Sequence, residues 1–199
     1  MNTDNDFVYK YYKKKGILEK ILFENLTDYP IDLFYKYNFT PNILTTFSFA
    51  FQLMSIIFLH INYNLSFFFL YILGYYFDCI DGPMARRYNM VTTFGDFYDH
   101  STDVICYLLS LNYYIYTLNI FDYPLLITTY FMFLFGLLKH VGCQEKIFNN
   151  NLKDKKKISK TLYFPMLFVG DAEKEMRYFR HTGFTSFALF HAMIPLIIV

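Results

Sequence analysis

The sequence predicts an all-α fold, a polytopic transmembrane helical bundle of five to six spans with an N-terminal amphipathic helix. Two observations predict it. Hydrophobic residues make up 55 % of the 199 residues and charged residues only 18 %, which is apolar for a soluble domain. In addition, four stretches contain no Asp, Glu, Lys or Arg: residues 41–77, 104–121, 123–138 and 183–199. We therefore expect a cytosolic N-terminal segment over residues 1–40 and one transmembrane domain over residues 41–199.

The lengths of the uncharged stretches predict five spans. A helix needs about 20 predominantly apolar residues to cross the hydrocarbon core. The spans are expected near residues 43–61, 65–77, 97–115, 125–140 and 182–199. The second is short and is expected to continue through the polar motif that follows it. Residues 162–170 are too few to cross and contain Pro165, so they are a candidate re-entrant or cytosolic amphipathic piece. Buried helices of a soluble domain are the alternative.

The basic residues predict the orientation of the bundle. With five spans, all 18 Lys and Arg fall in the segments that share one side: before residue 41, around residue 86 and over residues 139–180. The positive-inside rule then places the N-terminus and the motif around Arg86 in the cytosol. The first apolar run begins too late for a cleavable signal peptide. Ile17, Leu18, Ile21 and Leu22 follow helical spacing among lysines. This pattern predicts an amphipathic helix on the anionic membrane face, with a solvated basic tail as the alternative.

Four aspartates carry the chemistry that the sequence predicts. Asp78 and Asp81 are three residues apart at the end of the second span, and Asp99 and Asp103 are four apart at the start of the third. Each pair therefore shares one helix face. A helical hairpin would point both pairs at one place. Four carboxylates at a membrane edge repel one another and lose solvation, so the pattern indicates bound cations.

The residue types favour hard divalent cations and a nucleotide diphosphate. Oxygen-only ligands suit Mg²⁺ or Mn²⁺ and not zinc. Two such ions form the usual clamp for displacement at phosphorus. Gly82 and Gly95 leave room for a nucleotide or a neighbouring helix to approach the backbone. Arg86 supplies a fork of donors for a diphosphate. A helix cap or a surface charge is the alternative role for any single one of these aspartates.

At this point the sequence resembles a known family. Residues 78–103 match every fixed position of D-x2-D-G-x2-A-R-x8-G-x3-D-x3-D, the signature of the class-I CDP-alcohol phosphatidyltransferases. The stretch Pro41-Asn42-Ile43-Leu44-Thr45 is similar to the family's usual entry to the first helix. The resemblance covers residues 40–118, and the rest of the chain matches by hydropathy alone. Family members typically have six core spans, and only five are evident here.

The resemblance implies a role for each position of the signature. Asp78, Asp81 and Asp99 would be metal ligands. Asp103 would bind the second metal and act as the general base on the acceptor hydroxyl. The residues expected to line the CDP moiety are Gly82, Ala85, Arg86, Gly95 and, on weaker grounds, Asn42. The implied cofactors are two divalent cations, Mg²⁺ or Mn²⁺.

The implied activity is phospholipid biosynthesis in the membrane. A substituted phosphate would pass directly from a CDP-alcohol donor to an alcohol acceptor, with release of CMP and without a covalent intermediate. The lipid bilayer and a second copy of the chain are expected partners, since members commonly form homodimers. No nucleic-acid partner is expected. The active site is expected on the cytosolic face.

Donor and acceptor remain open at this stage. Asp99-His100 followed by Asp103 resembles the choline and ethanolamine phosphotransferases, in which the His is a candidate base, so His100 would assist or replace Asp103. His100 is equally a candidate for a packing residue. Residues 85–95 are instead similar to the phosphatidylglycerophosphate synthases, whose phosphorylated acceptor needs further cations. The candidates for that role are Arg87, Lys139, Arg177 and Arg180.

Two readings of another class remain. One is a catalytically inactive family member that serves as a membrane lipid- or nucleotide-binding subunit, against which the complete set of aspartates speaks. The other is a small cation transporter, because acidic residues in spans also mark ion paths. Residues 82–86 suit a phosphate better than an ion path. CMP release fits the enzyme alone.

Overall fold

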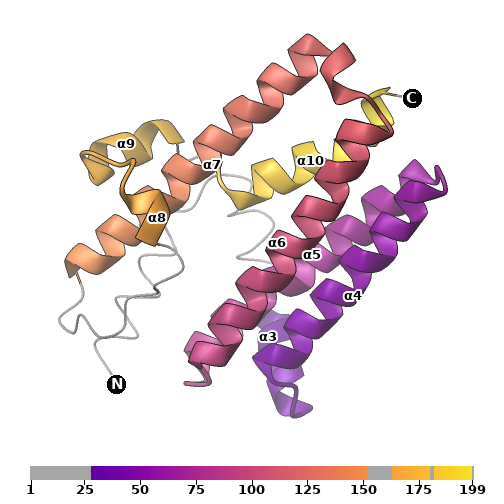
Figure 1. Cartoon of the computed structure of the whole chain (residues 1–199). Helices are drawn as coiled ribbons and strands as arrows, with labels where there is room; N and C mark the ends of the chain where they lie inside the picture. The colour runs from indigo at the N-terminus through magenta and orange to yellow at the C-terminus, as the bar shows by residue number, and fades with distance from the viewer. Residues whose placement is uncertain (1–27, 152–162, 180–181, 199) are drawn as a thin grey trace. The chain divides into compact units, whose positions relative to one another are not determined.

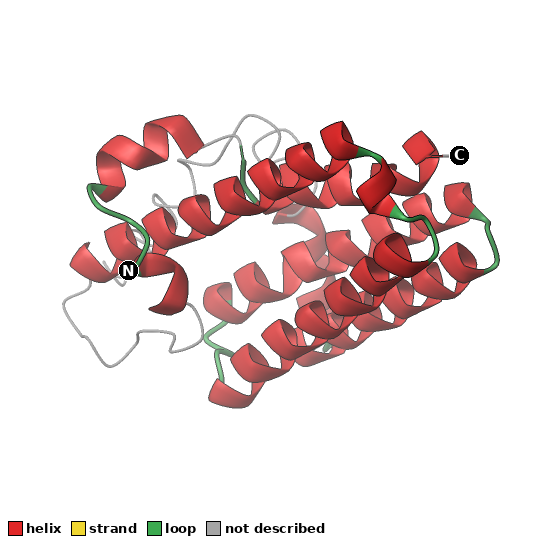
Figure 2. Cartoon of the chain, turned by 45° about the horizontal axis from the view of Figure 1, so that its top comes forward, coloured by secondary structure: helices red, strands yellow, loops and turns green. Residues whose placement is uncertain are grey.

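The computed structural model describes residues 28–151, 163–179 and 182–198, and within these ranges every regular element is a helix (Figure 2). The all-α prediction is thus confirmed. The expected amphipathic helix near residues 17–22 lies outside the described residues, and so do residues 152–162. The chain divides into two compact units, which we describe separately. One unit contains residues 28–130 and 188–198, and the other contains the described residues between 131 and 187.

The first unit is built mainly from four helices that follow one another along the chain (Figure 1). They are α3 (Asp28–Lys36), α4 (Pro41–His60), α5 (Asn64–Arg87) and α6 (Thr93–Tyr116). A short 3₁₀ turn, η1 (Ile120–Asp122), leads to α7 (Pro124–Asn151), and the last helix is α10 (Phe184–Ile198). As the sequence predicts, the second span continues through the acidic motif, because α5 ends only at Arg87. The third helix begins four residues earlier than the expected span, at Thr93 instead of residue 97.

Helix α4 packs closely along α5, and a glycine permits the approach. A Cβ atom on Gly74 would lie 2.7 Å from Gln52 Cγ and 3.0 Å from the backbone oxygen of Ser48. Small residues let helix backbones come together in a membrane, where dispersion and hydrogen bonds replace the hydrophobic effect. Gln52 donates to Ser48 Oγ at 3.0 Å, and Ser55 donates to the Gln52 carbonyl at 2.6 Å. The polar groups at this contact are therefore satisfied within α4 itself.

Asparagines end the helices of this unit. All four non-glycine residues with positive φ in the described ranges are Asn: Asn38, Asn62, Asn89 and Asn119. Asn tolerates the left-handed conformation that a helix C-terminus often requires. Directly after Asn62 in the chain, the amide of Tyr63 donates to the carbonyl of Phe58 at 2.9 Å. Directly after Asn89, the amide of Met90 donates to the carbonyl of Ala85 at 2.8 Å. These are Schellman bonds, and they fix where α4 and α5 turn.

Helix α3 is held at the end of α5. Ile31 lies in one buried cluster with Leu44, Ile80 and Met84, drawn from α3, α4 and α5. Asp32 accepts a hydrogen bond from Tyr88 at 2.5 Å and pairs with Arg87 at 3.0 Å. The bond to the Asp32 carboxylate raises the pKa of the Tyr88 hydroxyl. Since the Arg87–Asp32 pair is largely exposed, the buried cluster contributes more to docking than the ion pair does.

In the second unit, the later part of α7 holds two short helices, α8 (Tyr163–Met166) and α9 (Ala172–Phe179). Lys139 donates to Glu175 and to the carbonyl of Phe168, both at 2.7 Å. Lys146 donates to the carbonyls of Val169 and Gly170 at 2.7 and 2.9 Å. Helix α8 is the structure found within residues 162–170, the segment considered for re-entry. At four residues, it is too short to cross a bilayer.

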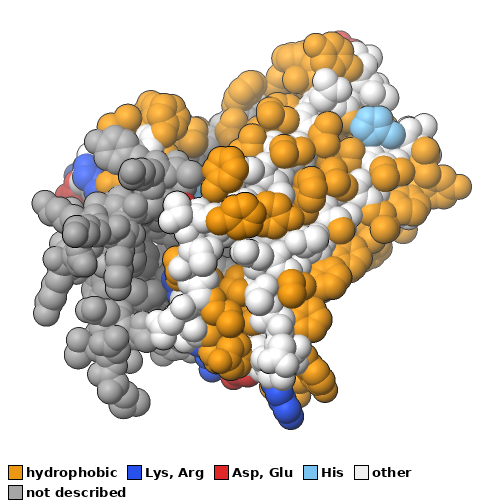
Figure 3. Space-filling model, turned by 60° about the horizontal axis from the view of Figure 1, so that its bottom comes forward, with side chains coloured by type: hydrophobic (Ala, Val, Ile, Leu, Met, Phe, Trp, Pro, Cys, Tyr) orange, Lys and Arg blue, Asp and Glu red, His pale blue; other side chains and the backbone are white. Residues whose placement is uncertain are grey.

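Four helical stretches are long and apolar enough to cross a membrane, judged by length and composition. They are Pro41–His60, Asn64–Arg87, Pro124–Gln144 and Ala172–Ile198, the last of which runs over residues 180–181, outside the description. Helix α6 is not among them, because three aspartates and His100 lie in its first turns. Hydrophobic side chains cover much of the described surface in Figure 3, as expected for a protein whose outer face meets lipid.

Candidate metal centre

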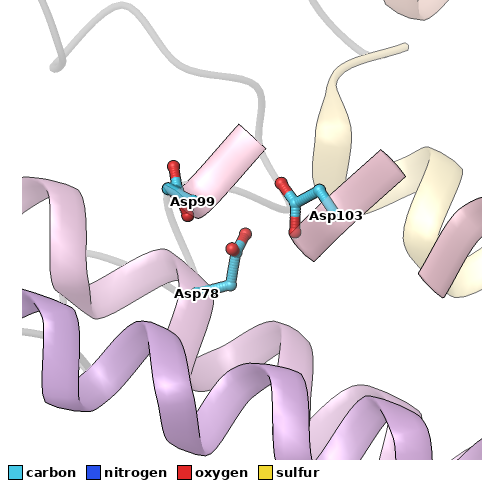
Figure 4. Close-up of side chains that lie close together, drawn as sticks. All are labelled: Asp78, Asp99 and Asp103. Atoms are coloured by element: carbon cyan, nitrogen blue, oxygen red, sulfur yellow. The ribbon is translucent and has the colours of Figure 1, made fainter. Parts of the chain in front are cut away.

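Three of the predicted aspartates converge (Figure 4). Each of Asp78, Asp99 and Asp103 offers a carboxylate oxygen, and these oxygens lie within 4.8 Å of one another. Asp78 comes from α5, and the other two come from α6. Opposite ligands of one Mg²⁺ are about 4.2 Å apart. The three oxygens therefore surround a space of the size that a small divalent cation needs.

A tight connection between α5 and α6 brings the two acidic pairs together. Asn89 ends α5, and Thr92 begins α6 by accepting a hydrogen bond from the amide of Gly95 at 2.9 Å. A threonine at this position satisfies one of the unpaired amides of the first turn. The residues between Arg86 and Gly95 in the motif thus form a capped turn, and the antiparallel helices place both acidic faces at one level.

The arrangement of these carboxylates is unfavourable by itself and would be stabilised by a bound cation. Asp99 Oδ1 is buried and has no hydrogen-bond partner in the protein. Asp99 also lies close enough to Asp78 and Asp81 to interact with both. Neighbouring buried carboxylates repel, and a buried oxygen without a partner costs about 1–3 kcal/mol. A hard cation would remove both penalties, and an all-carboxylate set of ligands suits Mg²⁺ or Mn²⁺.

Asp81 lies beside this group and has a partner of its own. It is only 4 % exposed, and its Oδ2 accepts a hydrogen bond from Thr45 Oγ1 at 2.5 Å. Thr45 lies on α4, so the first helix of the bundle orients this carboxylate. From the sequence, Thr45 is predicted only as part of the stretch that opens the first span.

His100 lies next to Asp99 and outside the group of converging oxygens. Its Nδ1 is 2.7 Å from the backbone oxygen of Asp96, one turn earlier in α6, and 3.8 Å from Asp99 Oδ2. A ring nitrogen this close to a carbonyl donates its proton to it. The contact therefore occupies Nδ1 and turns that side of the ring toward the backbone of its own helix.

The residues expected to line the nucleotide lie at the ends of the same helices. A Cβ atom on Gly95 would lie 2.9 Å from Asn42 Oδ1, so the start of α4 meets the start of α6 at this glycine. A Cβ atom on Gly82 would lie 3.3 Å from both terminal nitrogens of Arg86, so the guanidinium folds back over Gly82. Ala85 is half-buried in the last turns of α5. At Gly95 a neighbouring helix makes the close approach that the sequence predicts, whereas Gly82 meets a side chain of its own helix.

Two of the cations considered for a phosphorylated acceptor have ionic partners within their own units. Arg87 pairs with Asp32, and Lys139 pairs with Glu175. Lys139 and Arg177 belong to the second unit. Arg180 lies outside the described residues.

Sequence reasoning missed a second polar cluster in the first unit. His191 of α10 is fully buried, and its Nε2 lies 2.8 Å from Ser110 Oγ. Rings of four tyrosines lie around it: Tyr71, Tyr107, Tyr114 and Tyr130. One signal was available, because His191 is the only side chain among Asp, Glu, Lys, Arg, His, Tyr and Cys in residues 183–199, and ionisable residues in spans are functional candidates.

Comparison with known proteins agrees with this geometry. A protein of Aquifex aeolicus (strain VF5), described only as uncharacterized, is 37 % identical over 84 residues. The aligned stretch is 42 % of this chain and 43 % of that protein, so the chain spans less than half of the relative's length. No solved structure matches. Residues 38–194, by contrast, match a family profile described as CDP-alcohol phosphatidyltransferase, and the chain belongs to that family.

Proposed function

We propose that this membrane protein transfers a substituted phosphate group from a CDP-alcohol to the hydroxyl of an acceptor alcohol and releases CMP. Transfer from CDP-alcohols is the activity of its family, and the specific role of each residue here is our proposal. The observation that carries it is the convergence of Asp78, Asp99 and Asp103, with a buried oxygen of Asp99 left without a partner. These carboxylates need positive charge, which the protein itself does not supply.

In the proposed reaction, the acceptor oxygen forms a bond to the β-phosphorus and the bond from that phosphorus to CMP breaks. The hydroxyl proton passes to the carboxylate of Asp103. Asp103 is proposed as the base because it belongs to the converging group, whereas His100 lies outside it. The bond from Nδ1 of His100 to the backbone of Asp96 leaves Nε2 as its basic nitrogen, so His100 is the alternative base.

Two divalent cations, Mg²⁺ or Mn²⁺, are proposed to be held by Asp78, Asp81, Asp99 and Asp103. When bound, they would neutralise the diphosphate and stabilise the departing CMP. Thr45 keeps Asp81 turned toward this group. The proposed wall of the CDP site consists of Gly82, Ala85, Arg86, Gly95 and Asn42.

The pairing of Arg87 supports an acceptor that carries no phosphate. Arg87 is the candidate for a phosphorylated acceptor that lies in the same unit as the carboxylates, and it is paired with Asp32. A phosphorylated acceptor would have to break that ion pair and leave Asp32 without a counter-charge. A neutral alcohol needs only a general base and a space beside the phosphorus.

We further propose that α6 also crosses the membrane, since its 24 residues would extend about 36 Å. Five spans would then place all the basic loops, and with them the carboxylates, on the cytosolic face. A homodimer is also proposed, because members of the family commonly form homodimers.

The test is CMP release by the purified chain from radiolabelled CDP-diacylglycerol or CDP-choline, with and without Mg²⁺. The acceptors to compare are a diacylglycerol, a free polyol and glycerol 3-phosphate. We expect Mg²⁺-dependent CMP release with a neutral acceptor. Preference for glycerol 3-phosphate would contradict the acceptor proposal alone. Donor binding without CMP release under any condition would favour the alternative, an inactive member that binds lipid or nucleotide.

A further inference from the structure

The cluster around His191 is a filled polar contact between four helices. Its Nε2 lies 2.8 Å from Ser110 Oγ on α6, and its Nδ1 lies 3.2 Å from the hydroxyl of Tyr130 on the first turns of α7. The hydroxyl of Tyr114 donates to the backbone oxygen of His191 at 2.8 Å. On α5, the ring of Tyr71 lies 5.3 Å from the His191 ring.

The His191 ring is held on both sides. Ser110 Oγ lies 3.0 Å from the carbonyls of both Cys106 and Tyr107, so its proton is directed within α6 and it can accept from Nε2 of His191. On the other side, the hydroxyl of Tyr130 lies 3.2 Å from Nδ1 and also bonds to Tyr107. Both ring nitrogens therefore have partners on other helices.

The contacts of His191 lie in register with the carboxylates. Tyr71 is seven residues before Asp78 on α5, and Ser110 is seven residues after Asp103 on α6. Seven residues are two helical turns, about 10.5 Å along the axis, and return to the same face. Because α5 and α6 run in opposite directions, both contacts lie at one level beneath the carboxylates.

The carboxylates therefore lie between two points at which α5 and α6 are fixed. On one side is the capped turn of Asn89 and Thr92, and on the other is the His191 ring between Tyr71 and Ser110. A shift or rotation of α6 against α5 would move Asp99 and Asp103 away from Asp78. Supporting residues that hold metal ligands in place affect metal affinity without touching the metal.

We propose that His191 is a positioning residue for the carboxylate cluster: its ring sets the register of α6 against α5 and thereby the spacing of the metal ligands. The inference rests on the proposed function, because it assumes that the cluster binds a divalent cation.

The experiment measures Mn²⁺ binding to the purified full-length chain by electron paramagnetic resonance of the free ion, so it does not depend on turnover. His191→Phe keeps a ring and removes both nitrogens, and we expect it to weaken Mn²⁺ affinity about tenfold. His191→Gln keeps a nitrogen donor toward Ser110 and should recover most of that loss. Ser110→Ala, a smaller change, should weaken affinity about threefold. His60→Phe is the matched control, because its Nδ1 bonds to the carbonyl of Ile56 in its own helix, and a phenyl ring would keep its edge contact with the ring of Tyr113. It should stay within twofold of wild type.

The outcomes separate the two proposals. A wild-type chain that binds no Mn²⁺ overturns the proposed metal site, and the positioning role falls with it. Mn²⁺ binding that is equal in wild type and folded His191→Phe overturns the positioning role alone. A lower unfolding temperature with unchanged affinity does the same, since the contact would then be purely structural. If His191→Gln is no better than His191→Phe, the hydrogen bond to Ser110 is not the cause. If His191→Phe fails to fold, the Mn²⁺ affinity of Ser110→Ala becomes the test. A threefold loss supports the positioning role, and an unchanged affinity overturns it.

Discussion

Two polar clusters lie between α5 and α6, about two turns apart, and they differ in how their polar groups are satisfied. Around His191, each ring nitrogen and the backbone oxygen have a partner within the protein. Around Asp78, Asp99 and Asp103, carboxylates face one another, and a buried oxygen of Asp99 has no partner. Both clusters lie among apolar helices, where an unsatisfied polar group is costly.

The difference shows how a ligand site can be told from a structural contact. A cluster that is complete within the protein stabilises one arrangement of helices and leaves nothing for a ligand to do. A cluster with surplus negative charge is stable only when something from outside completes it. By this criterion we propose the carboxylates as the functional site and His191 as a residue that supports it. Variants of the carboxylate cluster test this distinction between a ligand site and a structural contact, and the expected effects decrease from Asp103 to Asp99 to Thr45.

Asp103→Asn tests the incomplete cluster most severely. An amide cannot take the acceptor's proton, and losing a positioned base typically lowers turnover by about 10²–10⁴-fold. CDP-alcohol binding should remain measurable, because the other carboxylates are unchanged. Rates of CMP release and donor binding check this, with Asp122→Asn, outside the cluster, as the control. Normal turnover by Asp103→Asn would remove the assignment of the base.

Magnesium should stabilise the fold through the same cluster. A ligand at 100 times its dissociation constant stabilises the folded state by about 2.7 kcal/mol, which thermal unfolding with and without Mg²⁺ would detect. Asp99→Asn should lose most of this gain. Without metal it should be more stable than wild type, by about 1 kcal/mol, because one of several crowded carboxylates is gone. An Asp99→Asn variant less stable than wild type in the absence of metal would argue against charge crowding.

Thr45→Val removes the donor that orients Asp81 and keeps the shape of the side chain. A hydrogen bond to a charged group contributes about 1.5–3 kcal/mol, so we expect a loss of about tenfold or more in kcat/KM. Thr45→Ser should restore activity. Thr128→Val, which loses only a bond to the carbonyl of Pro124 in its own helix, is the control. Equal activity of Thr45→Val and wild type would show that Asp81 needs no such support.

Much of this could be predicted from the sequence because the signals are local. Helical spacing within each acidic pair and a run of apolar residues before it predicted that α5 continues through the motif, and the structure confirms it. The convergence of Asp78, Asp99 and Asp103 followed from a hairpin with both pairs on inward faces. The glycines were also informative, since Gly95 does meet Asn42 from another helix.

The missed features depend on contacts between residues far apart in the chain. Thr45 and Asp81 are 36 residues apart, and His191 and Ser110 are 81 apart. No spacing rule connects such pairs, because the rotation of each helix is set by packing. The number of spans also could not be read directly, since the aspartates in the first turns of α6 lower its hydropathy. The roles proposed for the individual aspartates, His100 and Asn42 remain predictions.

The capped turn between α5 and α6 has a consequence for the order of folding. Only 25 positions separate Asp78 from Asp103, and contacts of short sequence separation form early because little loop entropy is lost. We therefore expect a nascent chain to assemble its carboxylates as soon as this hairpin has been synthesised, before α10 emerges from the ribosome. Crowded negative charge would then exist in an incomplete bundle, and early capture of a cation would favour its completion.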